Sequence, residues 1–155
     1  MTGKIDRRLG ELGIILPDAP LPAANYVPTV VSGSMLYVSG QICMKDGALI
    51  RGRLGADMDV AAGAEAARAC GMALIAQARA ALGGDLDRVA RVVKLTGFVN
   101  STPDFTDQPK VINGASDLMV EVFGEAGRHA RSAVSAASLP LGVAVEVEGI
   151  FEIRT

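Results

Sequence analysis

The sequence has no tryptophan, a single histidine and only two cysteines. Cys43 and Cys70 stand far apart and form no CxxC pair, so we expect two buried thiols in a reducing compartment. One histidine and two distant cysteines are too few ligands for a zinc site. The glycines also form no GxGxxG or P-loop pattern. The sequence therefore predicts neither a metal nor a cofactor.

Long apolar runs are missing too, since no stretch reaches the roughly 18 to 20 residues that a membrane helix needs. The charged start, Met1 to Arg8, is not followed by the apolar segment of a secretory signal. These absences predict a soluble, cytoplasmic protein with no membrane partner. Positive charge is scattered, the net charge is −2 and the pI is about 5.4, which argues against nucleic acid as a partner.

What the sequence has in excess is hydrophobic residues, which make up 50% of the chain. With no linker or repeat, the 155 residues predict one domain, 1–155, whose first part, 1–23, is a short helix at 5–12 and a proline-rich lead-in. One small domain has a limited interior. The apolar surplus therefore predicts a subunit interface in addition to a dense core.

The spacing of apolar residues predicts an α+β domain with two long helices. Asp59 is the expected N-cap of the first, which ends near residue 82. Pro109 is expected near the start of the second, which Gly124 closes. The predicted strands are 26–31, 35–39, 89–99, 132–138 and 143–153, with a hairpin turn at 32–34. This order favours a sheet with both helices on one face, and an apolar uncovered face would again indicate an oligomer.

Two glutamates and an arginine near the C-terminus are the strongest candidates for chemistry. Glu146 and Glu148 share one face of the last predicted strand, which most simply is a solvated surface, although like charges side by side do not stabilise a sheet. Arg131 precedes the small-residue run 132–138, which leaves room for a ligand. If the last two strands form an adjacent hairpin, Arg131 and Glu146 face one cleft. An arginine fork matches a carboxylate, and a glutamate can take a proton from water.

Several short motifs lie between about residue 24 and residue 153. They are Asn25-Tyr26-Val27, Ser39-Gly40-Gln41-Ile42, Val92 to Val99, Arg131-Ser132-Ala133-Val134, Leu139-Pro140 and Val145-Glu146-Val147-Glu148-Gly149-Ile150. Their order and spacing resemble the reactive-intermediate deaminase family, RidA, also called YjgF. The resemblance implies a chorismate-mutase-like fold, a mixed sheet with two long helices on one face. It also implies a homotrimer with clefts between subunits.

The resemblance implies hydrolysis of small carboxylated enamines and imines, such as 2-aminoacrylate, to a 2-keto acid and ammonia. By position, Arg131 would bind the substrate carboxylate and Glu146 would act on water. The other substrate-binding positions would be Tyr26, Gly40, Asn113 and Ala133. Ala133 stands where the family often has cysteine, and the short N-terminal helix is an addition to the usual start. These two departures indicate a divergent branch.

Two other functions fit the same residues. A binding protein for small carboxylated metabolites would need Arg131 but not Glu146, whereas an enzyme would need both. An endoribonuclease or translation inhibitor, a label often attached to this family, fits less well because the chain is acidic and has no basic stripe. His129 lies in the segment before Arg131, where a surface or interface position is the simpler interpretation and a role in the cleft the alternative.

Overall fold

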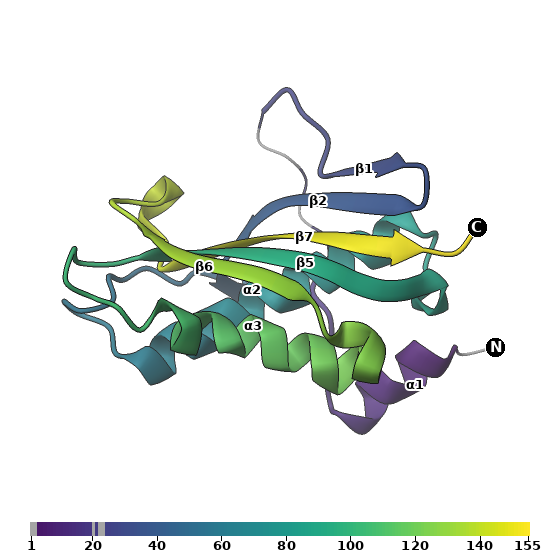
Figure 1. The fold of residues 1–155 in the computed structure, drawn as a ribbon, viewed down its shortest axis with the longest axis horizontal. Coiled ribbons are helices and arrows are strands. Elements are labelled where there is room, and N and C mark those ends of the chain that lie inside the picture. Colours follow the sequence, from purple (N-terminus) through teal and green to yellow (C-terminus); the bar gives the residue numbers. More distant parts are fainter. Residues whose placement is uncertain (1–2, 20, 22–23) are drawn as a thin grey trace.

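The fold, described for residues 3–19, 21 and 24–155 of a computed structural model, is a five-stranded sheet lying on two long helices (Figure 1). The elements in chain order are α1 (Lys4–Glu11), β1 (Thr29–Ser32), β2 (Met35–Ile42), β3 (Met44–Lys45), β4 (Ala48–Leu49), α2 (Val60–Ala81), η1 (Leu86–Arg88), β5 (Val89–Asn100), α3 (Gln108–Phe123), η2 (Gly124–Gly127), β6 (Ala130–Ala136), η3 (Pro140–Gly142) and β7 (Val145–Ile153). The predicted α+β class is confirmed.

The order of strands across the sheet is β1-β2-β7-β5-β6. β5 and β6 are parallel, and the other neighbouring pairs are antiparallel. β3 and β4 form a separate two-stranded ribbon. β6 and β7 are therefore not the adjacent hairpin that the sequence suggested. β5 lies between them, and the chain from β6 to β7 passes around its end, where the Asn100 backbone N–H donates to the carbonyl of Ala144.

Local signals set the helix boundaries as expected. The Asp59 carboxylate accepts a hydrogen bond from the backbone N–H of Ala62 at 2.8 Å and caps α2. Pro109 lies in the first turn of α3, and Gly124, at φ 63°, ends it. The two helices cross closely at Gly114, where a Cβ would collide with the carbonyl oxygen of Ala64.

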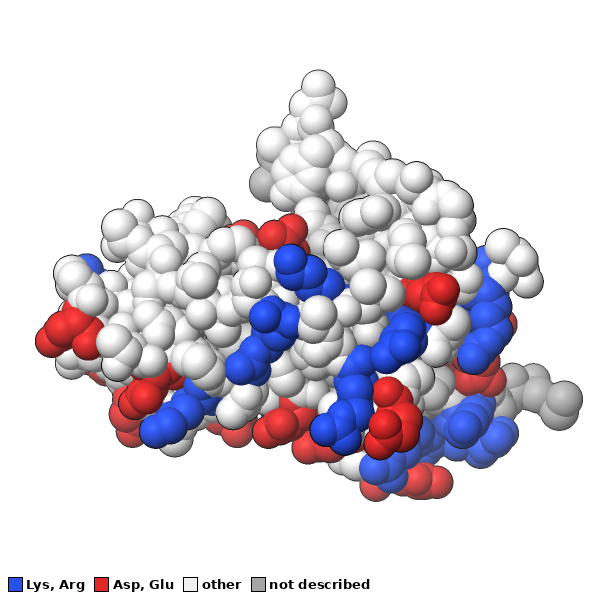
Figure 2. Space-filling model, viewed as in Figure 1, with Lys and Arg blue, Asp and Glu red and all other residues white. Residues whose placement is uncertain are grey.

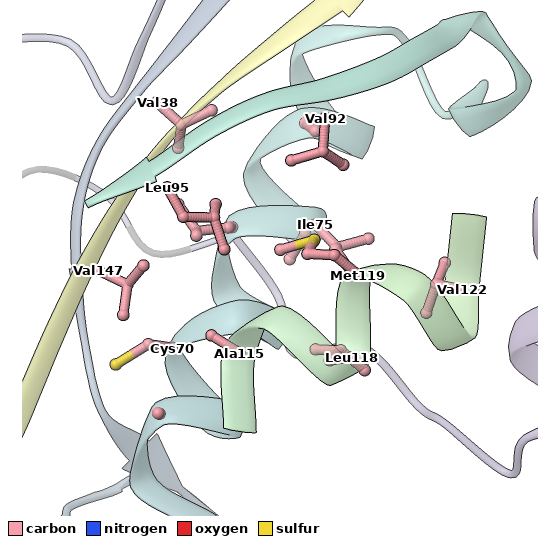
Figure 3. Close-up of a cluster of buried hydrophobic side chains, with 14 of the residues drawn as sticks. Val38, Cys70, Ile75, Val92, Leu95, Ala115, Leu118, Met119, Val122 and Val147 are labelled. Atoms are coloured by element: carbon pink, nitrogen blue, oxygen red, sulfur yellow. The ribbon is translucent and has the colours of Figure 1, made fainter. Parts of the chain in front are cut away.

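The core lies between these helices and one face of the sheet (Figure 3). The buried strand residues alternate, as a half-covered sheet requires. Fully buried side chains of the sheet are Leu36, Val92, Leu95, Val99, Val145, Val147 and Phe151, and those of the helices include Leu74, Ile75, Ile112, Leu118 and Met119. In the described part of the chain, no helix has both the length and the apolar character to cross a membrane.

The short N-terminal helix is confirmed, and it is fastened to the body of the molecule by side chains far along the chain. The backbone N–H groups of Lys4 and Ile5 both donate to the Asp87 carboxylate at 2.9 Å. Arg8 Nε donates to the carbonyl of Glu121 on α3 at 2.8 Å, and Leu9 is buried. Asp87 thus satisfies two N–H groups that a helix start leaves without an intrahelical partner.

The uncovered face of the sheet is mixed rather than apolar. Facing side chains in register include Tyr37, Ile150 and Lys94 in one row and Thr96 with Glu148 in the next. Charged residues are absent from one end of the sheet and the segment before it, since residues 19–44 contain no Asp, Glu, Lys or Arg. Figure 2 shows an uncharged region over β1, β2 and the segment before them, while charged side chains spread over α3 and β5–β6.

Candidate active site

Glu146 lies near the start of β7, in register with Ile42 of β2 and Phe98 of β5. The register of β2 against β7 shifts between Val38 and Gln41, and Gly40 lies within this irregular stretch. A Cβ at Gly40 would collide with the Glu146 carboxylate. The absence of a side chain at Gly40 is therefore what gives the carboxylate its space.

A cleft of about 530 Å³ opens beside Glu146. It is lined by Leu21, Tyr26, Pro28, Ser39, Gly40, Gln41, Ile42, Met44, Gln77, Pro140, Leu141 and Glu146. Three of the predicted site residues, Tyr26, Gly40 and Glu146, thus come together. Tyr26 does so from the segment before β1 and not from the strand in which the sequence placed it, since β1 begins only after Pro28. Tyr26 is 53% exposed.

Burial raises the pKa of the Glu146 carboxyl, and the neighbouring charge of Glu148 raises it further. Burial and Glu148 are the causes of this shift, and no hydrogen bond from a described residue contributes to it. A half-buried carboxyl with a raised pKa keeps its proton to a higher pH than an ordinary glutamate, which favours a role in proton transfer.

Two buried glutamines form the wall behind Glu146, and sequence reasoning did not assign them to the site. Gln77 Nε2 donates to Gln41 Oε1 at 3.3 Å, and Gln41 Nε2 donates to the carbonyl of Ser39 at 3.0 Å. The signal was present at Gln77, which continues the buried stripe of α2 one heptad after Cys70. A polar residue in such a stripe needs partners, and Gln41 at the cleft is one of them.

Arg131 and Asn113 form a second group. They line an open groove between β6 and α3 with a volume of about 620 Å³. Arg131 Nη1 donates to Asn113 Oδ1 at 2.7 Å and to Ser116 Oγ at 3.2 Å. His129 is half-buried and lines the same groove, and its role stays a prediction. Ala133 lies two residues further along β6, on the same face as Arg131, in register with Gly97.

One chain does not bring these two groups together. Arg131 pairs with Leu95 of β5, which pairs with Gly149 of β7, and this row faces the helices. Glu146 lies three residues away along β7 and in a row that faces away from the helices. With β5 in between, the strands of Arg131 and Glu146 are about 10 Å apart. The expectation of a shared cleft on adjacent strands is wrong within one chain.

Across residues 3–19, 21 and 24–155, no three His, Cys, Asp or Glu side chains gather as metal ligands. Independence from metal stays a prediction. Activity that is unchanged after dialysis against EDTA would support it, and activity lost with EDTA and restored by zinc or manganese would contradict it.

The chain is similar to a known family and to several of its members over almost its whole length. The family described as "YjgF/chorismate_mutase-like, putative endoribonuclease" matches residues 6–152. Protein TCP17 of Trypanosoma cruzi is 54% identical over 155 residues, covering 99% of this chain and 96% of its own. The crystal structure of Atu1372 from Agrobacterium tumefaciens, of unknown function, is 52% identical with a TM-score of 0.90, over 97% of this chain and 92% of that one.

A more distant structure carries a ligand. It is Escherichia coli TdcF with bound serine, 27% identical with a TM-score of 0.62, over 91% of this chain and 98% of that one. The match to the family spans nearly the whole chain, and the sequence motifs, the strand order and the two helices agree with it. The chain belongs to the YjgF/chorismate mutase-like (RidA) family, and its similarity to Atu1372 and TCP17 places it among the divergent members.

Proposed function

We propose that the protein hydrolyses small imines and enamines that carry a carboxylate, releasing a 2-keto acid and ammonia. Many members of the family are enamine or imine deaminases, and the family is typically trimeric. The observation that carries the proposal is the division of the candidate residues into two groups on opposite faces of the sheet. Each complete site then consists of the Arg131 groove of one subunit and the Glu146 cleft of its neighbour.

The Arg131 group supplies an anchor for the substrate carboxylate. Both of its hydrogen bonds use Nη1, so within the described residues Nε and Nη2 remain available as a parallel pair of donors. Such a pair matches the two oxygens of a carboxylate. Serine, the molecule bound in the TdcF structure, also carries a carboxylate and an amine on neighbouring atoms.

The Glu146 group supplies the proton transfers. A water oxygen adds to the imine carbon while Glu146 accepts a proton from that water and passes it to the imine nitrogen, which gives a carbinolamine. Glu146 then takes the hydroxyl proton and delivers it to the amine nitrogen, so the carbon–nitrogen bond breaks as the carbon–oxygen double bond forms, and ammonia leaves. The raised pKa of Glu146 supports this role, because a carboxyl that titrates nearer neutral pH can both accept and return a proton.

Subunit complementation tests the shared site. Arg131→Ala and Glu146→Gln should each abolish turnover of 2-aminoacrylate generated in place, measured as ammonia release. Unfolding the two variants together in equal amounts and refolding them should restore about a quarter of wild-type activity, because each site draws its two halves independently from equal pools. Each variant refolded alone is the control.

Two other results would contradict the shared catalytic site. A mixture of assembled but inactive subunits would show that both residues act within one chain. Wild-type protein that binds pyruvate but turns over no imine would favour the alternative of a non-catalytic binding protein, which the Arg131 groove alone could support.

A further inference from the structure

The Arg131 groove contains a chain of hydrogen bonds that substrate binding and water activation do not account for. His129 Nδ1 lies 2.6 Å from the carbonyl oxygen of Gly127, and His129 Nε2 lies 2.9 Å from Ser116 Oγ. Ser116 Oγ in turn accepts from Arg131 Nη1 at 3.2 Å. The chain of contacts therefore runs from the backbone before β6, through a histidine and a serine, to the guanidinium.

The chemistry of these groups fixes the direction of each bond. A carbonyl oxygen can only accept, so Nδ1 of His129 carries a hydrogen. In the neutral ring Nε2 is then an acceptor, and the Ser116 hydroxyl must donate to it. This leaves the Ser116 oxygen with its lone pairs directed to Arg131. Ser116 therefore contacts the His129 ring and accepts a hydrogen bond from Arg131.

We propose that Ser116 and His129 are positioning residues that hold the Arg131 guanidinium in its carboxylate-binding orientation, and that protonation of His129 links carboxylate binding to pH. The second part rests on the proposed role of Arg131. Asn113 and Ser116 both bond to Nη1, so together they fix one edge of the guanidinium and leave the other toward the open groove. A lone arginine on an edge strand would otherwise have many rotamers to lose on binding.

The electrostatic link has a defined sign. Burial lowers the pKa of His129 most, the hydrogen bond from the ring to Gly127 opposes that shift, and the positive charge of Arg131 lowers the pKa further. A carboxylate bound to Arg131 offsets that charge, so binding raises the pKa of His129. By linkage, carboxylates then bind more tightly as the pH falls through the pKa of His129.

Other charged groups surround the ring and belong to the same balance. Asp117 and Glu121 line the groove from α3, and Arg128 lines it from the segment before β6. Glu121 is paired with Arg68 at 3.1 Å, and the carbonyl of Arg128 accepts from Arg91 of β5. Arg131 is the one among these whose charge shifts the pKa of His129.

Because His129 is the only histidine of the chain, its ring gives a single set of imidazole signals in NMR spectra. In the free protein we expect the Nδ1–H tautomer by ¹⁵N correlation. A pH titration should give a higher pKa for His129 in Arg131→Gln than in the wild type. Neither measurement needs a substrate, so both stand whether or not the proposed deaminase activity is found. The Nε2–H tautomer, or the same pKa in both proteins, would overturn the inference.

Pyruvate, a simple 2-keto acid, is the probe for binding, measured by calorimetry from pH 8 to pH 5.5. Wild-type affinity should rise on the order of fivefold as the pH falls. Ser116→Ala should weaken binding at pH 8 about tenfold, the effect of losing roughly one hydrogen bond to a charged group. Ser116→Thr keeps the hydroxyl and should retain affinity, which separates lost positioning from a damaged helix.

His129→Gln is the matched variant for the pH effect. A glutamine amide oxygen can still accept from Ser116 but does not titrate, so binding at pH 8 should stay within about twofold of the wild type and lose its dependence on pH. An unchanged pH dependence in His129→Gln, or full affinity in Ser116→Ala, would show that the network does not act on Arg131.

Discussion

At the scale of single residues, the candidate carboxylate depends on a neighbour that has no side chain. Gly40 lies in the irregular pairing of β2 and β7, and any Cβ there would strike the Glu146 carboxylate. Its backbone φ lies outside the left-handed region, so the constraint is one of space and not of backbone conformation. Spatial constraints of this kind leave the fold intact when they are violated and displace the functional group instead.

Gly40→Ala should therefore impair activity without unfolding the protein. We expect kcat/KM to fall by tenfold or more, because a displaced general base loses its alignment with water, an effect that reaches about 100-fold per ångström. The melting temperature should change by only a few degrees, since the adjusting group is a side chain at a cleft. The control is Ala48→Gly, at an exposed position of β4. Gly47→Ala would be a poorer control, because the φ of 79° at Gly47 would strain an alanine.

Glu146→Gln should separate activity from stability. As general base, Glu146 must be ionised, so kcat should fall by about 10² to 10⁴ when it is replaced. A raised pKa in the folded state means that the charged form is disfavoured by folding. Glu146 therefore contributes to the free energy of unfolding only at low pH, and this contribution is lost as the pH rises through its folded pKa. At pH 7 the neutral glutamine should thus melt no lower than the wild type, by calorimetry.

Glu148→Gln is the matched control for that experiment. It lies on the same face of β7, and its charge is one of the two causes of the raised Glu146 pKa. Removing it should preserve turnover at pH 8 and shift the acid limb of the kcat profile to lower pH. A loss of kcat at pH 8 equal to that of Glu146→Gln would show that the two carboxylates were assigned the wrong way round.

At the scale of elements, α1 shows how a short helix is held where its own sequence could not hold it. A helix of eight residues is marginal in isolation. Its Gly3 N-cap has no side chain to accept from the first turn, and the Asp87 carboxylate, more than 80 residues away, accepts instead. A Cβ at Gly3 would meet that carboxylate at 2.8 Å. The start of α1 therefore packs directly against the Asp87 side chain of η1.

Asp87→Ala should release the start of α1. We expect a loss of about 1 kcal/mol in the free energy of unfolding, as for a lost N-cap, and faster hydrogen exchange confined to residues 3–11. The hydrogen bonds from Ile5 and Lys4 lower the pKa of Asp87. Its contribution is therefore present above the unfolded pKa and disappears as the pH falls through the lower, folded pKa. Asp87→Asn keeps an acceptor oxygen and should lose less; equal exchange in all three proteins would contradict this anchoring.

At the scale of the whole molecule, the uncharged surface and the divided site have a common explanation in assembly. Exposed apolar side chains gather on the segment without charges, including Leu21, Val27, Val30 and Val31. Burying such a patch between subunits is favourable, at about 25 cal/mol for each Å² removed from water. The same contact would complete the site, because the neighbour could supply the half that one chain turns away.

We expect a trimer of about 48 kDa, three times 16.0 kDa, by light scattering at micromolar concentration. Val30→Glu places a charge on the uncharged patch and should shift the mass toward 16.0 kDa and abolish turnover together. Ile15→Glu, at an even more exposed apolar position outside the charge-free segment 19–44, should remain trimeric and active. A stable wild-type monomer would contradict both the assembly and the shared site.

The sequence by itself determined the elements whose signals are local. Asp59 and Gly124 mark helix ends because capping is decided within a few residues, and the alternation in 143–153 showed which side chains of β7 share a face. The motifs from residue 24 to residue 153 indicated the family, which the comparison confirmed. Tyr26, Gly40 and Glu146 were also selected on this basis, and they lie in one cleft.

Only the tertiary structure decided which strands are neighbours. The period of a strand shows its faces but not its partners, and the short connection from β6 to β7 fits an adjacent hairpin as well as one split by another strand. β5 enters between them and pairs along both edges, in parallel with β6 and antiparallel with β7. That placement puts Arg131 and Glu146 on opposite faces and brings Ser116 and His129 to the arginine, because contacts between α3 and β6 depend on how the whole sheet is packed.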